Sequence, residues 1–162
     1  MMFTTHLLIG VVIAIVYDPS LIFIIIAGSV FPDIDILFSH RRTAHAPFVF
    51  LISSLIVYII SPLSFVFLFM CSLHSFIDIL GSKSMEPWKE ESTNKSVYNH
   101  ISEKWIVTET IIYDGSKEDF ILSTILLIPI IILANNSDII IFSILFYIIG
   151  LFYTIFRKRF VL

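Results

Sequence analysis

Long apolar runs separated by short polar breaks dominate this chain of 162 residues. Residues 7–31 are apolar except around Asp18-Pro19-Ser20, and residues 46–80 break in the same way at Ser61-Pro62. Asp-Pro and Ser-Pro are turn signals, and proline disfavours helix in the residue before it. The pattern therefore predicts two short helical hairpins, with helices at roughly 3–17 and 20–31 and two more within 46–80.

A second interpretation takes residues 7–31 as one span of about 25 residues, enough to cross a bilayer core of about 30 Å. Asp18 would then lie at mid-membrane, at a cost of at least about 2.5 kcal/mol, which favours the hairpin. Hairpin helices of 12–15 residues reach only about 18–22 Å. The sequence leaves open whether they cross the bilayer or enter it in part.

A polar segment and a second apolar region complete the chain. Residues 81–119 carry charges of both signs, with Trp88 and Trp105 as candidate interfacial anchors. Two apolar helices follow at 120–134 and 139–156, joined at Asn135-Asn136. We expect an all-α integral membrane protein of about six helices in three parts: a four-helix metal-site bundle at 1–80, a polar cytoplasmic loop or subdomain at 81–119, and a C-terminal transmembrane hairpin that anchors the chain at 120–162.

Composition supports a membrane protein. Hydrophobic residues make up 57% of the chain and charged residues 14%, with a mean hydropathy of +0.97, whereas soluble domains carry about 25% charged residues. The net charge of −3 argues against a nucleic-acid substrate. Cys71 lies in an apolar run and is expected to pack. The N-terminus lacks the basic start of a signal peptide, so we expect it to be retained.

Charge also predicts an orientation in the cell membrane. The turns at 18–20, 61–64 and 135–138 contain no Lys, Arg or His. Every Lys, Arg and His falls in stretches that the hairpin count places on the opposite side, and basic residues in short loops favour the cytoplasm. The sequence predicts a multi-pass protein with both termini facing the cytoplasm.

The same count gathers histidines and aspartates at that cytoplasmic end. His6 lies near the start of the first helix, His45 opens the third, and His74 and Asp78 close the fourth with the i, i+4 spacing of one helix face. Asp33 and Asp35 follow the second helix, so both carboxylates can reach one centre. The candidate ligands are His6, Asp33, Asp35, His40, His45, His74 and Asp78.

Imidazole and carboxylate ligands suit a divalent transition metal, with zinc expected first and manganese as the alternative. Seven candidates exceed the four ligands of one tetrahedral zinc, so one or more ions are expected. A bound ion lowers the pKa of its water to about 7 and makes hydroxide available at neutral pH. We assign Asp33 and Arg41 as catalytic candidates, with Arg41 clamping a phosphate oxygen. Arg41-Arg42 is most simply explained as a positive-inside anchor, and His100 as a loop histidine.

The order of these motifs resembles the YdjM-like family of membrane-bound metal-dependent hydrolases, also described as LexA-binding and inner-membrane-associated. The resemblance rests on His6, PDID at 32–35, HRRTAH at 40–45 and HSFID at 74–78. EPW at 86–88, VYNH at 97–100 and YDGSKED at 113–119 extend it, so it covers about residues 1–120. Thr43 stands one position early, and Ala46 stands where a serine is common.

The family is similar in pattern to zinc-dependent phospholipases C, which implies a phosphoester substrate, such as a membrane lipid headgroup. Glu109 and Asp114 are further candidate bases or supporting carboxylates. Two rival functions remain: a non-enzymatic membrane protein with a structural or sensory metal site, and a metal transporter. A transporter needs ionisable residues at mid-span, and the hairpin reading places none there. A protein partner is compatible with each function, but no segment of the sequence identifies one.

Overall fold

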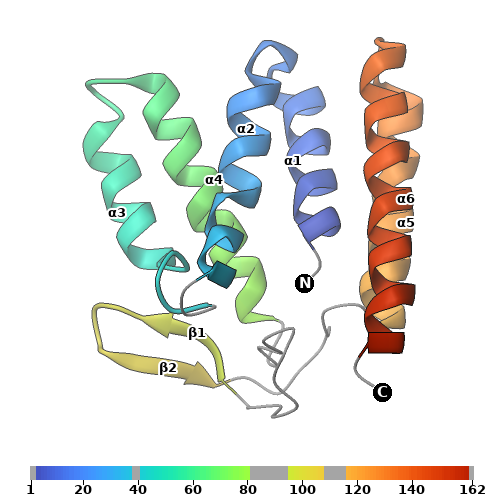
Figure 1. Ribbon diagram of the computed structural model, residues 1–162. Helices are drawn as coiled ribbons and strands as arrows, with labels where there is room; N and C mark the ends of the chain where they lie inside the picture. Colours follow the sequence, from blue (N-terminus) through green and yellow to red (C-terminus); the bar gives the residue numbers. More distant parts are fainter. Residues whose placement is uncertain (1–2, 38–40, 81–94, 108–115, 161–162) are drawn as a thin grey trace.

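The computed structural model describes residues 3–37, 41–80, 95–107 and 116–160. Helices run side by side along one direction, and a small sheet lies across one end of them (Figure 1). In chain order the elements are α1 (Phe3–Tyr17), η1 (Pro19–Leu21), α2 (Ile22–Val30), η2 (Phe31–Leu37), α3 (Pro47–Val57), α4 (Pro62–Ile79), β1 (Lys95–Asn99), β2 (Lys104–Val107), α5 (Lys117–Leu133) and α6 (Ser137–Phe160).

The two predicted hairpins are confirmed, and a polar residue followed by proline makes the turn in each. Asp18 has an extended backbone, accepts a hydrogen bond from the Ser20 amide at 2.9 Å and is followed by Pro19. Ser61 caps α4 in the same way ahead of Pro62. An oxygen-bearing cap satisfies an amide that the helix leaves open, and proline needs no amide partner at the first helical position. The single-span interpretation of residues 7–31 is therefore wrong.

Glycines allow the helices of the bundle to approach closely. A side chain at Gly10 of α1 would collide with Ser29 of α2. A Cβ at Gly28 of α2 would lie 2.6 Å from the carbonyl oxygen of Phe67 in α4. Backbones approach in this way where small residues line a helix interface. Helix α2 consequently lies between α1 and α4, and its C-terminal end leads into η2.

Apolar contacts join the four-helix bundle, α1–α4, to the C-terminal pair, α5 and α6. One buried cluster joins Leu7, Leu8 and Val11 of α1 to Ile130 of α5. A second cluster joins α1, α2 and α4 through Ala14, Ile25 and Met70. Helix α1 therefore belongs to both groups and connects the four-helix bundle to the C-terminal pair.

The fold is mostly helical, as predicted, but the polar segment also forms a two-stranded antiparallel sheet that the hydrophobic pattern did not predict. Lys95 pairs with Val107 and Tyr98 with Trp105, so β1 contains one more residue than β2 between these pairs. This irregularity is a β-bulge at residues 96–97. The strands β1 and β2 lie beneath the ends of α3 and α4 (Figure 1).

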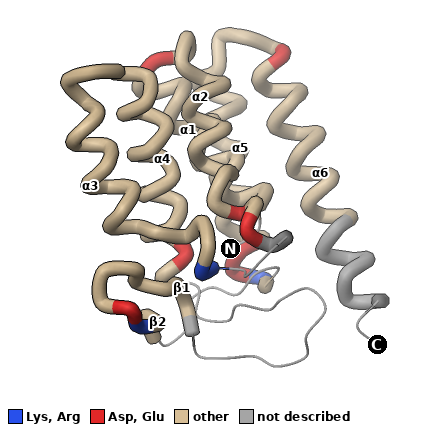
Figure 2. The backbone as a smooth tube through the Cα atoms, turned by 60° about the vertical axis from the view of Figure 1, so that its left-hand side comes forward, with Lys and Arg blue, Asp and Glu red and all other residues tan. Residues whose placement is uncertain are grey.

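Charge is unevenly distributed along the bundle. In the coloured part of Figure 2, Lys and Arg occur only at the end that carries the sheet, whereas the opposite end shows acidic positions alone. Among the described helices, only Pro62–Ile79 is long and apolar enough to cross a membrane by length and composition. Shorter apolar helical stretches of 10–17 residues are Phe3–Tyr17, Pro47–Val57 and, within α6, Ser137–Phe152.

Candidate metal site

Four ligand-type side chains converge at the sheet end of the bundle. Asp33 comes from η2, His45 from the loop before α3, and His74 and Asp78 from the last two turns of α4. One ligand atom from each of these residues lies within 4.8 Å of the ligand atoms of the other three. We call these four residues the metal-site group.

The two imidazoles of the group are fixed in orientation by hydrogen bonds at their outer nitrogens. His74 Nδ1 lies against the carbonyl oxygen of Ser29 in α2, and a carbonyl can only accept. His45 Nδ1 lies 2.8 Å from Asp35 Oδ2, and that carboxylate also accepts the Ala44 amide at 3.1 Å. Both histidines therefore carry their proton on Nδ1 in the neutral form and present a bare Nε2.

The two bare nitrogens face each other. His45 Nε2 and His74 Nε2 are 3.1 Å apart, and Asp78 Oδ2 lies 3.1 Å from His45 Nε2. Asp33 Oδ1 lies 3.5 Å from His74 Nε2 and 3.8 Å from His45 Nε2. Four lone-pair atoms at such distances repel one another unless a proton or a metal ion lies among them. The arrangement, with each imidazole held from behind by an oxygen, is that of metal-ligating histidines.

The buried carboxylate oxygen of Asp33 also indicates a cation site. Its Oδ2 is buried and is one of two such side-chain atoms in the described residues for which no hydrogen bond is found. Without a metal ion, burial raises the pKa of Asp33, but the charge and hydrogen bond of a protonated His74 lower it to about 2. A buried, ionised oxygen with no donor is costly unless a cation meets it. The donor set therefore fits a divalent metal ion.

His6 and Asp35 border the group without joining it. His6 Nε2 lies 2.9 Å from Asp78 Oδ1, and its ring stacks on that of His74 at 3.7 Å between centroids. Asp35 is fully buried and contacts the outer nitrogen of His45. Both positions suit a residue that orients a ligand, and direct ligation by either residue stays a prediction.

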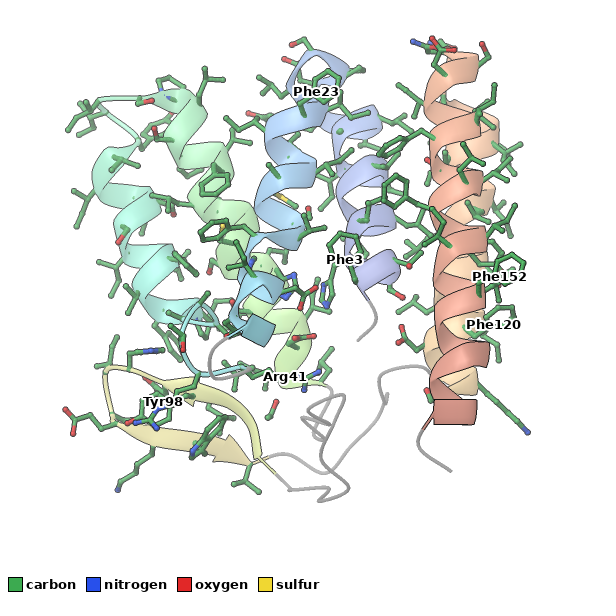
Figure 3. The ribbon with its side chains drawn as sticks, viewed as in Figure 1. Phe3, Phe23, Arg41, Tyr98, Phe120 and Phe152 are labelled. Carbon is green, nitrogen blue, oxygen red and sulfur yellow. The ribbon has the colours of Figure 1, made fainter. Side chains whose placement is uncertain are left out.

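Arg41 also reaches the group. Its Nε lies 3.5 Å from Asp78 Oδ2, and the side chain is 2% exposed. Figure 3 shows Arg41 between the sheet and the ends of the helices. In the absence of a metal ion, a proton on His74 and the charge of Arg41 face the three carboxylates of Asp33, Asp35 and Asp78. A divalent ion that displaced the His74 proton would balance these carboxylates together with Arg41.

Other sequence candidates lie elsewhere. His40, Glu109 and Asp114 fall outside the described residues. His100 is exposed beside Tyr98 on the sheet, away from the metal-site group, as expected for a loop histidine. Sequence reasoning missed the Ser29 carbonyl, because any residue supplies a carbonyl and only the packing of α2 on α4 places this one. It also missed the roles of Ser96 and Tyr98 in β1, although Tyr98 lies in the VYNH motif at 97–100.

Comparisons of the chain with protein-family models, curated proteins and solved structures found no match. The resemblance to the YdjM-like family therefore stays a prediction from motifs. The fold and the metal-site group define a mostly helical protein that can hold a metal ion at one end of its bundle.

Proposed function

We propose that this protein is a membrane-bound, metal-dependent hydrolase whose substrate is a phosphoester. The observation that carries the proposal is the pair of bare imidazole nitrogens, 3.1 Å apart, with Asp33 and Asp78 beside them. A divalent ion at this position, zinc or manganese, would acidify water and so supply a nucleophile at neutral pH. His45, His74 and Asp78 would hold the ion.

Asp33 is the residue we assign to proton transfer. Its side chain is 17% exposed, whereas those of His45, His74 and Asp78 are at most 1% exposed. Asp33 is therefore the most exposed member of the metal-site group. A water oxygen attacking phosphorus there would give its proton to the Asp33 carboxylate as the ester P–O bond breaks, and the leaving oxygen would take a proton from solvent.

Arg41 is the cation we assign to the phosphoryl group. A guanidinium binds phosphate oxygens through two parallel hydrogen bonds. Arg41 already lies beside Asp78 at the edge of the metal-site group. Neutralising the Asp78 carboxylate with a metal ion would leave the Arg41 charge available to a phosphoryl oxygen.

The outer surface supports a bilayer location. Large apolar side chains cover the helices, and near the ends farthest from the sheet Phe23, Ile59 and Ile60 are 80–90% exposed. Phe23 projects from that end in Figure 3. Only 39% of the residues of α4 are buried, although α4 is the longest helix of the four-helix bundle. Water would penalise such a surface, and lipid tails would not. We propose a multi-pass orientation with the metal-site group facing the cytoplasm, because the basic residues lie at its end.

The proposal is tested first by elemental analysis of detergent-purified protein. Wild type should carry at least one equivalent of zinc or manganese, and His74→Ala should lose it while circular dichroism stays helical. Asp33→Asn should retain metal but lose hydrolysis of chromogenic phosphomonoesters, phosphodiesters or phospholipid vesicles. Asp138→Asn, an exposed carboxylate at the opposite end, is the matched control for loss of charge. Wild type that binds no metal even after zinc is added would refute the proposal.

One observation favours a structural metal site as the second candidate. The metal-site group offers four ligands, enough to close a tetrahedral zinc, and catalytic zinc keeps one position open. A structural ion would exchange slowly, and its removal would unfold the bundle. The metal-loaded protein would have no hydrolase activity. The structural function would be supported if the metal-loaded protein hydrolysed no phosphoester in the screen and unfolded when the metal was chelated.

A further inference from the structure

Strand β1 contacts two of the three segments that carry the metal-site group, α4 and the loop before α3, and its bulge directs two successive side chains inward. Side chains in a regular strand alternate between its faces, so neighbours are not both buried. Ser96 and Val97 are nevertheless both 0% exposed. The extra residue at positions 96–97 explains this, because a bulge re-aims a side chain that the regular pleat would turn away.

The bulge directs the Ser96 hydroxyl at the end of α4. Its Oγ donates to the carbonyl oxygen of Asp78 at 2.9 Å and lies 3.0 Å from that of Ile79. The last carbonyls of a helix lack an amide from a following turn, so other groups satisfy them, and Ser96 joins the C-cap Leu80 amide at Asp78. Ser96 therefore fixes the backbone of Asp78, the residue that brings its carboxylate into the metal-site group.

The next residues of β1 hold the loop that carries Arg41. The Tyr98 amide donates to the Arg41 carbonyl at 3.0 Å. Arg41 has a φ of 58°, in the left-handed region that is uncommon for a residue with a Cβ. The Arg42 guanidinium lies over the Tyr98 ring at 5.0 Å, on the outer side of the same loop. Strand β1 thus holds in place a conformation that turns Arg41 inward and Arg42 outward.

We propose that strand β1 is the positioning element of the metal site, with Ser96 as the residue that sets Asp78 and the Tyr98 backbone as the group that sets Arg41. The inference rests on the proposed function, since it assigns a role towards the metal ion. The two contacts converge on one carboxylate, because Asp78 is held through its own backbone by Ser96 and through its Oδ2 by Arg41. Ser96 reaches the metal-site group through the backbone of Asp78, and Tyr98 reaches it through the loop that carries Arg41.

Ser96→Ala tests this inference in detergent-purified full-length protein loaded with Co²⁺, whose visible absorption bands report the geometry of its ligands. We expect Co²⁺ affinity to fall by about 10- to 100-fold, the usual effect of losing a group that orients a ligand. The absorption bands should shift as well. Ser96→Thr keeps the hydroxyl and should restore the wild-type bands, even if its extra methyl lowers the melting temperature.

Ser123→Ala is the matched control. Ser123 is also a buried serine, 1% exposed, and its hydroxyl donates to the Phe120 carbonyl within α5. The same atom is removed there, so any general loss of stability is reproduced without a change near Asp78. Co²⁺ affinity and bands in this control should match wild type. Ser96→Ala with a spectrum and affinity equal to those of Ser123→Ala would overturn the inference while leaving the metal site intact.

Two further outcomes separate the inference from the proposed function. If Ser96→Ala does not fold, the same Co²⁺ measurement is made on Ser96→Cys, because a thiol is a weaker donor of similar size. A graded shift of the Co²⁺ bands supports the positioning role, and wild-type bands refute it. Wild type that binds neither Co²⁺ nor zinc would overturn both the inference and the proposed function. Wild type that binds Co²⁺ but hydrolyses no phosphoester would overturn only the hydrolase.

Discussion

The metal-site bundle and the C-terminal helix pair bury polar groups in different ways. In residues 3–80 the buried histidines and aspartates contact one another between segments, as His6 does with Asp78 and His45 with Asp35, whereas the buried serines Ser29 and Ser75 bond back to their own helices. In α5 and α6 the buried serines Ser123 and Ser143 bond back to carbonyls of their own helices. Hydrogen bonds between segments hold the side chains of the site in place relative to one another. A serine that bonds to a carbonyl of its own helix satisfies only its own hydroxyl.

The boundary between the two regions has a polar part beside its apolar cluster. Thr5 donates to Asp119 Oδ1 at 2.6 Å, both residues being fully buried, and a Cβ at Gly150 of α6 would collide with Thr4. Both contacts fall on the first turn of α1, next to His6. The C-terminal pair was predicted to anchor the chain, and its contacts show that it also packs against the helix that carries a candidate ligand.

The largest effect is expected from removing a carboxylate of the metal-site group. Asp78→Ala should lower metal affinity by more than about 100-fold, because it removes a ligand and not merely its support. It should also destabilise the protein by about 3–5 kcal/mol, since Arg41 loses a buried counter-charge. Isothermal titration with zinc and thermal unfolding measure the two effects. Asp78→Ala with wild-type metal content would contradict the site.

Thr5→Val probes the boundary with nearly the same side-chain shape. It removes the hydroxyl that donates to the buried Asp119 carboxylate, and hydrogen bonds to charged groups contribute about 1.5–3 kcal/mol. We expect a lower melting temperature with unchanged metal stoichiometry, measured by circular dichroism and elemental analysis. The control Thr124→Val removes the exposed hydroxyl that contacts Tyr147 within the C-terminal pair and should cost less. Metal loss in Thr5→Val would show that the two regions depend on each other.

Gly150→Ala tests the close approach of α6 to α1. The added Cβ meets Thr4, so α6 must shift, and overpacking typically costs about 1–3 kcal/mol. Ile149→Ala, at a neighbouring exposed position, serves as the control and should change stability by no more than about 0.5 kcal/mol. Unfolding in detergent compares the two variants. Equal stability of both would mean that α6 does not pack on α1 through Gly150.

The smallest effect is expected from acid titration of Asp33 in chelator-treated protein. The pKa of this carboxyl is lowered from 3.8 to about 2, so its ionised form stabilises the folded state above pH 3.8. That stabilisation is lost as the pH falls towards 2. The difference in unfolding free energy between wild type and Asp33→Asn should therefore shrink between about pH 4 and pH 2. The pKa of Asp18 is also lowered, but Asp18 is present in both proteins, so its contribution to the unfolding free energy cancels in the difference. A difference that grows on acidification would contradict this assignment.

The helices could be predicted because their signals are local. Asp18-Pro19 and Ser61-Pro62 interrupt apolar runs, and capping and proline geometry act within a few residues. The turns in the structure fall at these pairs, and α1 spans the predicted residues 3–17. Counting helices then placed His45, His74, Asp33 and Asp78 at one end, since consecutive antiparallel helices alternate in direction. The metal-site group follows from that count.

Tertiary structure alone decided which atom of each site residue faces the metal position and which atom faces a supporting group. His74 presents Nε2 because the packing of α2 on α4 places the Ser29 carbonyl at its Nδ1, and Asp35 turned out to face the outer nitrogen of His45. The bulge of β1 and its bond from Ser96 to the end of α4 depend on contacts between segments 18 residues apart. Local propensity cannot encode such contacts. The sequence determined which residues are gathered at one end of the bundle, and long-range packing determined the atom by which each of them contributes.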